Sequence, residues 1–121
     1  MSHKTGPSNE HLVQLIQELR KVCATQKAAL WGRIADDLSR ATRQRRAVNV
    51  SRINRSTAAN EIVIVPGKVL GSGMVDHSVT VAAFAFSTSA KQRIQEAKGK
   101  TLSIPELLKQ NPQGKNIRIL C

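Results

Sequence analysis

The chain has 121 residues, of which 40% are hydrophobic. These values suit one folded domain with a modest core and argue against a fully disordered chain. Lys and Arg number 19 against 8 Asp and Glu, which gives a formal net charge of +11. Such an excess repels itself in a compact fold, so an RNA or DNA partner is the simplest explanation for it.

An anionic membrane surface would also attract positive charge, but that use favours a basic amphipathic helix with large apolar residues opposite. The sequence contains no such helix and no run of about 18 apolar residues that could cross a bilayer. Residues 1–7 are polar and lack the apolar region of a signal peptide. We therefore expect no membrane partner and a soluble, cytoplasmic protein.

The two cysteines, Cys23 and Cys121, form no CxxC pair and have no histidine at zinc spacing. We interpret them as free thiols, which fits a reducing compartment. The sequence therefore predicts no metal site.

Two helices are predicted in the N-terminal third. Between Ser8 and Thr25 apolar residues recur at spacings of three and four, and Ser8 or Asn9 can cap the helix start. A second, shorter helix carries an apolar face, although Gly32 near its start disfavours helix. The apolar faces consist of Leu12, Leu15, Ile16, Leu19, Val22 and Cys23, and of Leu30, Trp31, Ile34, Ala35 and Leu38.

An arginine-rich segment follows, from residue 40 to residue 55. It holds Arg40, Arg43, Arg45, Arg46, Arg52 and Arg55, with no lysine and no acid before residue 60. The planar guanidinium fork can donate two hydrogen bonds to one phosphate, so this composition favours geometric phosphate contacts. Six neutralised phosphates would give a logarithmic salt slope of about −4 to −5. A solvated basic loop or a nuclear-import-like patch is the alternative. The chain is expected to pass from extended to helical near Ser51.

From residue 61 onward the pattern is that of an α/β fold with short elements. Strands are predicted at 61–65 and 68–70, separated by a turn at Pro66-Gly67, and a third strand at 79–86 is apolar on nearly both faces. A helix is expected at 87–97. Ser103 and Glu106 form a capping-box pattern that opens a short helix ending near Asn111, and residues 117–119 read as a last strand.

The aromatic side chains are few, namely Trp31, Phe84 and Phe86, and there is no tyrosine. Phe84 and Phe86 lie in the most apolar run of the chain, so we predict that they belong to the core. Proteins that read unpaired bases usually present several exposed aromatic rings. The sequence therefore favours binding of folded RNA through phosphate, sugar and shape, with little reading of bases.

No catalytic or nucleotide-binding constellation is found. The glycine-rich stretch 67–73 does not match a phosphate loop, and the three histidines and eight acids do not form a recognisable site. We expect no enzyme activity, no cofactor and no small-molecule substrate. A regulatory or architectural binder of DNA or messenger RNA, or a small nucleotide-using enzyme, remain the alternatives.

The order of several blocks resembles the archaeal and eukaryotic large-subunit ribosomal protein family numbered eighteen-e, over essentially the whole chain and with the length of the archaeal form. The blocks are Trp31-Gly32, Arg43-Gln-Arg-Arg46, 48–54, 63–73, 79–83, Phe86-Ser87, Ser89-Ala-Lys91, 111–114 and 117–119. One departure is Ala58-Ala-Asn60, where family members carry an acidic turn.

The resemblance implies a structural constituent of the large subunit in the cytoplasmic ribosome, bound to large-subunit ribosomal RNA and packed among other ribosomal proteins. It also implies kinship with the C-terminal domain of the bacterial-type large-subunit protein numbered fifteen, and hence strand-strand-helix turns wound into an irregular, superhelix-like domain. The predicted fold is one α/β domain over 1–121, with a helical and basic part (1–60) and an α/β core (61–121). The predicted RNA contacts are Lys4, Arg40, Arg43, Arg45, Arg46, Asn49, Arg52, Arg55, Lys68, Lys115 and Arg118.

Overall fold

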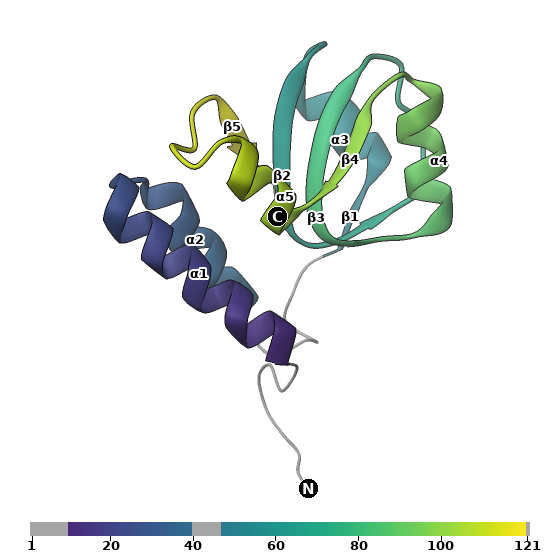
Figure 1. Ribbon diagram of the computed structural model, residues 1–121. Helices are drawn as coiled ribbons and strands as arrows, with labels where there is room; N and C mark the ends of the chain where they lie inside the picture. Colours follow the sequence, from purple (N-terminus) through teal and green to yellow (C-terminus); the bar gives the residue numbers. More distant parts are fainter. Residues whose placement is uncertain (1–9, 40–46, 121) are drawn as a thin grey trace, which may run out of the picture.

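The computed structural model describes residues 10–39 and 47–120, which form a mixed α/β fold with five helices and five strands (Figure 1). The elements in chain order are α1 (Glu10–Gln26), α2 (Ala29–Leu38), β1 (Ala47–Asn49), α3 (Val50–Ser56), β2 (Glu61–Leu70), β3 (Val79–Phe86), α4 (Thr88–Glu96), β4 (Lys100–Ser103), α5 (Ile104–Gln110) and β5 (Ile117–Ile119).

The five strands form one parallel sheet in the order β1-β2-β3-β4, with β5 also paired to β2. Strand β3 follows one edge of β2 along most of its length. The other edge of β2 is shared: β5 pairs with residues 62–64 and β1 pairs with residues 68–70. Ten residues of β2 therefore hold together strands that lie about seventy positions apart in the sequence.

The predicted turn at Pro66-Gly67 is wrong, because β2 runs through both residues and both are buried. The register shifts there instead: Val65 pairs with Ala83 and Lys68 pairs with Ala85. Two residues of β2 thus lie opposite the single residue Phe84, which is the count of a β-bulge. A bulge tolerates proline because the missing N–H removes no regular ladder bond.

Helices cover both faces of the sheet, as parallel strands require. Helices α1, α2 and α5 pack against Ile64 and Ala82, whereas α3 and α4 pack on the opposite face against Val63 and Val81 (Figure 1). This arrangement confirms that the start of β3 is buried on both sides.

Phe84 departs from the prediction that both phenylalanines belong to the core. Its side chain is 42% exposed, whereas Phe86 is partly buried against the cluster around α3 and α4. The physical reason is local: Phe84 lies opposite the β2 bulge, where the regular alternation of inward and outward side chains is interrupted.

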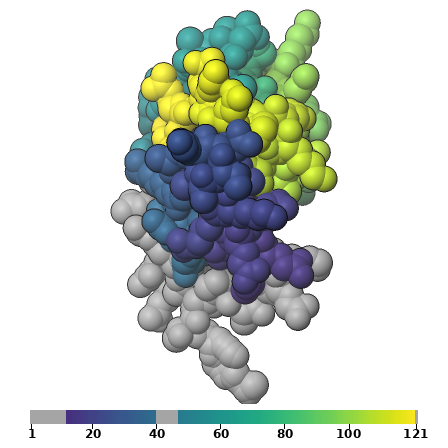
Figure 2. Space-filling model, turned by 60° about the vertical axis from the view of Figure 1, so that its left-hand side comes forward, coloured from purple at the N-terminus to yellow at the C-terminus, as the bar shows by residue number. Residues whose placement is uncertain are grey.

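The N-terminal helices occupy the segments predicted to be helical, and they pack closely. A Cβ atom at Gly32 would lie 2.9 Å from Cys23 Sγ, so the glycine that disfavours helix allows α1 and α2 to approach. Figure 2 shows α5 and the C-terminal segment lying against these helices. Trp31, which is fully buried, donates a hydrogen bond from Nε1 to Pro112 O at 2.8 Å.

Two side chains confirm the predicted capping box of α5. Ser103 Oγ accepts from the backbone N–H of Glu106 at 3.2 Å, and Glu106 Oε1 accepts from the N–H of Ser103 at 2.8 Å. The backbone hydrogen bond from Ser103 lowers the pKa of the Glu106 carboxyl below its usual value. Among the described helices, none is long and apolar enough to cross a membrane.

Candidate nucleic-acid interface

The described part of the arginine-rich segment is β1 and α3. Val50 and Ile53 are fully buried, which fixes one face of α3 against the sheet. Arg52 and Arg55 are exposed and lie three positions apart, so they share a side of the helix. Neither forms an ion pair with a residue that the structure describes. These two guanidinium groups are therefore available to an anion from outside.

The loop between β2 and β3 holds α3 in position. The N–H of Ser51 donates to Ser72 O at 3.2 Å, and the N–H of Asp76 donates to Asn54 Oδ1 at 3.1 Å. Gly73 has a φ of +100°, and a Cβ there would lie 2.3 Å from Ser51 Cβ. The absence of a side chain at Gly73 therefore allows the loop to approach α3 closely.

Asp76 and His77 also help to attach the loop between β2 and β3 to α3. His77 Nδ1 lies 3.0 Å from Asp76 Oδ1, and His77 Nε2 lies 2.8 Å from Thr57 Oγ1 at the end of α3. The hydrogen bond from His77 is the main reason why the pKa of the Asp76 carboxyl is lowered. The pair thus anchors a helix.

Lys68 lies beside Ala47, where the arginine-rich segment enters the sheet. It is exposed on β2 and pairs in register with Ala47, the first described residue after position 46. Neighbouring strands are about 4.8 Å apart, so the backbone of Lys68 adjoins the point where that segment enters the sheet. Asn49, also exposed, ends β1. Lys68 thus lies beside the start of β1, Asn49 lies at its end, and Arg52 and Arg55 lie on the helix that follows it directly.

Lys115 and Arg118 lie elsewhere. Arg118 on β5 pairs in register with Val63, five residues before Lys68 along β2, which corresponds to roughly 16 Å of strand. Lys115 is exposed in the preceding loop, where Asn111 holds its backbone with hydrogen bonds of 2.8 and 3.3 Å. These two predicted contacts form a second group at the other end of the sheet.

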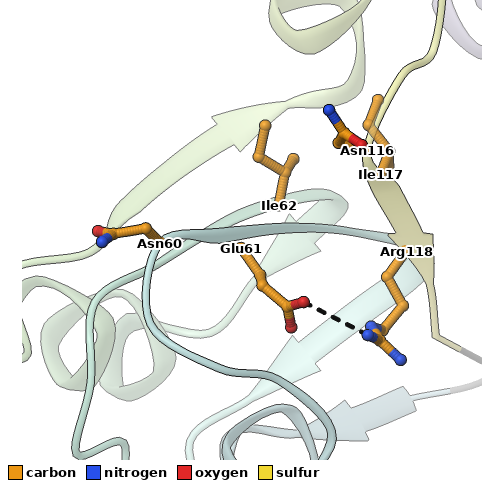
Figure 3. Close-up of a pocket in the computed structure, with 6 residues that line it drawn as sticks. All are labelled: Asn60, Glu61, Ile62, Asn116, Ile117 and Arg118. Atoms are coloured by element: carbon orange, nitrogen blue, oxygen red, sulfur yellow. Dashed lines mark hydrogen bonds and ion pairs between the residues drawn. The ribbon is translucent and has the colours of Figure 1, made fainter.

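Arg118 differs from the other predicted contacts that the structure describes because it already has an anionic partner. Its Nη2 lies 3.4 Å from Glu61 Oε2 (Figure 3). The N–H of Ala58 donates to Glu61 Oε1 at 2.8 Å, and this bond, with a smaller contribution from Arg118, lowers the pKa of Glu61. Glu61 thus already offsets part of the charge that Arg118 could present to a phosphate.

Around that ion pair lies a hollow with a volume of about 750 Å³. Asn60 and Asn116 contribute to it and precede β2 and β5, both with positive φ (68° and 59°). The Asn60 side chain points away from Arg118 (Figure 3). The carboxylate of Glu61 and the guanidinium of Arg118, which both line the hollow, are paired with each other.

Five predicted contacts, namely Lys4, Arg40, Arg43, Arg45 and Arg46, lie outside the described residues. Over the residues that are described, no group of three His, Cys, Asp or Glu side chains could hold a metal ion. Sequence reasoning missed one exposed side chain with a potential role, Phe84, whose only sequence signal is the proline-glycine pair on the neighbouring strand.

Comparison with known proteins gives a consistent result. The family model for ribosomal protein 60S L18 and 50S L18e matches residues 1–121. The "Large ribosomal subunit protein eL18" of Methanothermobacter thermautotrophicus is 45% identical over 120 residues, which cover 99% of each chain. Its counterpart in Sulfurisphaera tokodaii is 42% identical over 99% of this chain and 98% of its own. The chain therefore belongs to the family of 60S L18 and 50S L18e ribosomal proteins.

Proposed function

We propose that this protein is a structural, non-catalytic constituent of the large subunit of the cytoplasmic ribosome. It binds large-subunit ribosomal RNA and stabilises its folded form through contacts from Arg and Lys to phosphates. Its partners are that RNA and neighbouring ribosomal proteins, and its work requires no cofactor, metal or small-molecule substrate. Membership of the family supports this role, and the net charge of +11 supports an anionic partner.

One structural observation carries the proposal: Arg52 and Arg55 lie exposed on a helix that is fixed at both its buried face and its loop side. A positioned guanidinium loses less freedom on binding than one on a mobile segment. Asn49 ends β1, and Lys68 pairs with Ala47, the residue that follows the arginine-rich residues Arg40, Arg43, Arg45 and Arg46 in the sequence. We assign the primary RNA contact to this surface.

Lys115 and Arg118 are proposed as a second contact, with Lys4 as an additional one. Arg118 is expected to contribute less than Arg52, because Glu61 already offsets part of its charge. The finer aspects of the fold, namely a single domain over 1–121, a superhelix-like winding and kinship with the protein numbered fifteen, form part of the same proposal.

Binding to purified large-subunit ribosomal RNA over a range of salt concentrations tests the primary contact. Replacing both Arg52 and Arg55 with Ala should weaken binding and reduce the logarithmic salt slope by about 1.4–1.8, at 0.7–0.9 per lost phosphate contact. A matched control removes two other exposed cations, Arg93 on α4 and Lys109 on α5. If the control lowers the slope equally, binding follows net charge and the assigned surface is wrong.

Sedimentation tests the role itself. The endogenous protein should travel with large subunits at low salt and dissociate as salt is raised. A protein that sediments separately at low salt, or that prefers duplex DNA to ribosomal RNA at equal salt, would contradict a ribosomal role.

A further inference from the structure

Phe84 presents an aromatic ring at the C-terminal end of β3. It is 42% exposed, although the preceding Val81, Ala82 and Ala83 are at most 2% exposed. The β2 bulge opposite Phe84 interrupts the alternation that would otherwise bury a residue of this type. Ligands of open α/β sheets bind at the carboxyl ends of the strands, and Phe84 lies near the end of β3 and close to the end of β4.

Phe84 forms a wall of two small hollows. One, of about 200 Å³, has mainly apolar walls that include Leu15, Ile104 and Pro105. The other, of about 290 Å³, includes Phe86, Lys91 and Thr101. Both are smaller than the roughly 300–1,000 Å³ of sites that enclose a whole small molecule. Their size suits one planar group laid against the ring.

Ser103 is the one polar residue among those that line the first hollow, whereas the second has several. Lys91 and Thr101 line it, and Gln92 and Gln95 lie next to Phe86 in a further hollow that shares Lys91. None of these four side chains forms a hydrogen bond or ion pair with another described residue, so each can serve a ligand. The carboxylate of Glu106 is engaged by the N–H of Ser103.

The second hollow also adjoins the primary RNA contact. Its wall residue Ala85 pairs in register with Lys68. Lys68 in turn pairs with Ala47, where the arginine-rich segment enters the sheet. Ala47 on β1, Lys68 on β2 and Ala85 on β3 therefore lie side by side on three neighbouring strands. A ligand in the hollow would therefore lie close to the surface that we assign to phosphate contacts.

We propose that Phe84 is a stacking platform for one unpaired base of the bound RNA. The base lies on the ring, and Lys91 contacts the phosphate or the base edge beside it. An aromatic ring with a cation and polar groups at its rim matches a nucleotide, which has an apolar face, a polar edge and a charge. The inference rests on the proposed function and deepens it, because it adds a base contact to a surface otherwise assigned to phosphates.

The test compares two RNA stems that differ by one unpaired 2-aminopurine. The full chain and its Phe84→Leu variant are titrated against both. Phe84→Leu should weaken binding of the stem with the unpaired base by about 5- to 100-fold, the usual worth of one stacked base. Binding of the fully paired stem and the salt slope should not change, because no phosphate contact is lost. Quenching of the 2-aminopurine fluorescence on binding should also be lost.

Phe84→Tyr is the matched control, because it keeps the ring and should keep both the affinity and the quenching. Equal effects of Phe84→Leu on the two stems, or no effect on either, would overturn the platform. The Arg52→Ala, Arg55→Ala variant separates this result from the proposed function, because it should weaken both stems alike. If the unaltered chain binds neither stem in a salt-dependent way, the proposed function itself fails.

A second measurement decides between RNA and protein as the occupant. A chain with Phe84→p-benzoyl-phenylalanine is incorporated into large subunits and irradiated. Crosslinks from position 84 to ribosomal RNA support the platform. Crosslinks to a neighbouring ribosomal protein would overturn it and assign the hollow to that protein.

Discussion

Trp31 connects two parts of the chain that are 81 positions apart. Its ring is fully buried between α2 and the C-terminal loop, and its single polar atom donates to Pro112 O. An indole that is buried needs a partner for its N–H, so the loop has to keep this carbonyl in place. The residue therefore ties the N-terminal helices to the segment that delivers β5 to the edge of β2.

Replacing Trp31 with Phe should lower the free energy of unfolding by about 1–3 kcal/mol. About 0.5–1.5 kcal/mol comes from the lost hydrogen bond, and the remainder comes from the space left by the smaller ring. Because Trp31 is the only tryptophan, urea unfolding is followed by far-ultraviolet circular dichroism. Met74→Leu, at a side chain 70% exposed, is a control expected to stay within about 0.5 kcal/mol. A Trp31→Phe variant as stable as the control would show that the hydrogen bond from Trp31 to Pro112 does not stabilise the fold.

The stability that Glu106 gives to the first turn of α5 depends on pH. Its pKa is lowered by the hydrogen bond from the backbone of Ser103, so the folded state holds the charged form more strongly than the unfolded state does. This contribution is present above the unfolded value near 4.5 and is lost as the pH falls through the folded value. Glu106→Gln keeps an oxygen for the Ser103 N–H but cannot titrate.

The stability difference between the unaltered chain and Glu106→Gln should therefore be largest near neutral pH and shrink as the pH falls below about 4.5. Urea midpoints measured from neutral pH to about pH 3 check this. Both proteins lose the contributions of Asp76 and Glu61 over the same range, since these pKa values are lowered too, so the comparison isolates Glu106. A difference that stays constant with pH would contradict the assignment.

The contact between α1 and α2 depends on the absence of a side chain at Gly32. Alanine would favour the helix by about 1 kcal/mol, but its Cβ would meet Cys23 Sγ at 2.9 Å. Gly32→Ala should thus stabilise the chain by close to that amount when Cys23 is also replaced with Ala. In the unaltered background the gain should be smaller or reversed, with a coupling of about 0.5–3 kcal/mol.

Chemical unfolding of the two single variants and the double variant measures this coupling directly. If Gly32→Ala changes stability equally in both backgrounds, within about 0.3 kcal/mol, the two residues do not constrain one another. The same comparison shows why the sequence could place α2 but could not explain its glycine. Helix periodicity is local, whereas the reason for Gly32 lies in a different helix.

Elements with strong local patterns were predictable from the sequence. The helix that opens with Ser103 was marked by its capping box, and β3 has the residue range that its apolar run indicated. Strands β1 and β4, with three and four residues, carry little pattern of their own and depend on their neighbours for hydrogen bonds. The turn predicted at Pro66-Gly67 was wrong. This residue pair usually marks a turn, but pairing of β2 with β3 overrides that preference.

At the scale of the molecule, the candidate interface was predictable in composition but not in arrangement. The arginines could be found by counting, because charge density is visible in the sequence. That Lys68 adjoins Ala47 depends on the register of a parallel pair, and that Arg118 is paired with Glu61 depends on contacts 57 positions apart. The exposure of Phe84 is likewise set by a neighbouring strand. Long-range pairing thus decides which of the predicted cations are available.

The net charge of +11 gives salt two opposite effects on this protein. Repulsion among the cations opposes the compact state, and added salt screens it, so the free energy of unfolding of the chain alone should rise with ionic strength. Binding of ribosomal RNA should weaken over the same range, because released counterions drive it. RNA should therefore stabilise the chain most at low salt, by about 2.7 kcal/mol when its concentration is 100 times the dissociation constant.

Urea unfolding with and without a large-subunit ribosomal RNA fragment, at a series of salt concentrations, measures both effects together. The two stability curves should converge at high salt, where the RNA no longer binds. The Arg52→Ala, Arg55→Ala variant should show a weaker salt dependence without RNA, since less repulsion remains to be screened, and a smaller gain from RNA. Curves that stay parallel would mean that binding does not depend on phosphate contacts, because only those contacts link the affinity to salt so steeply.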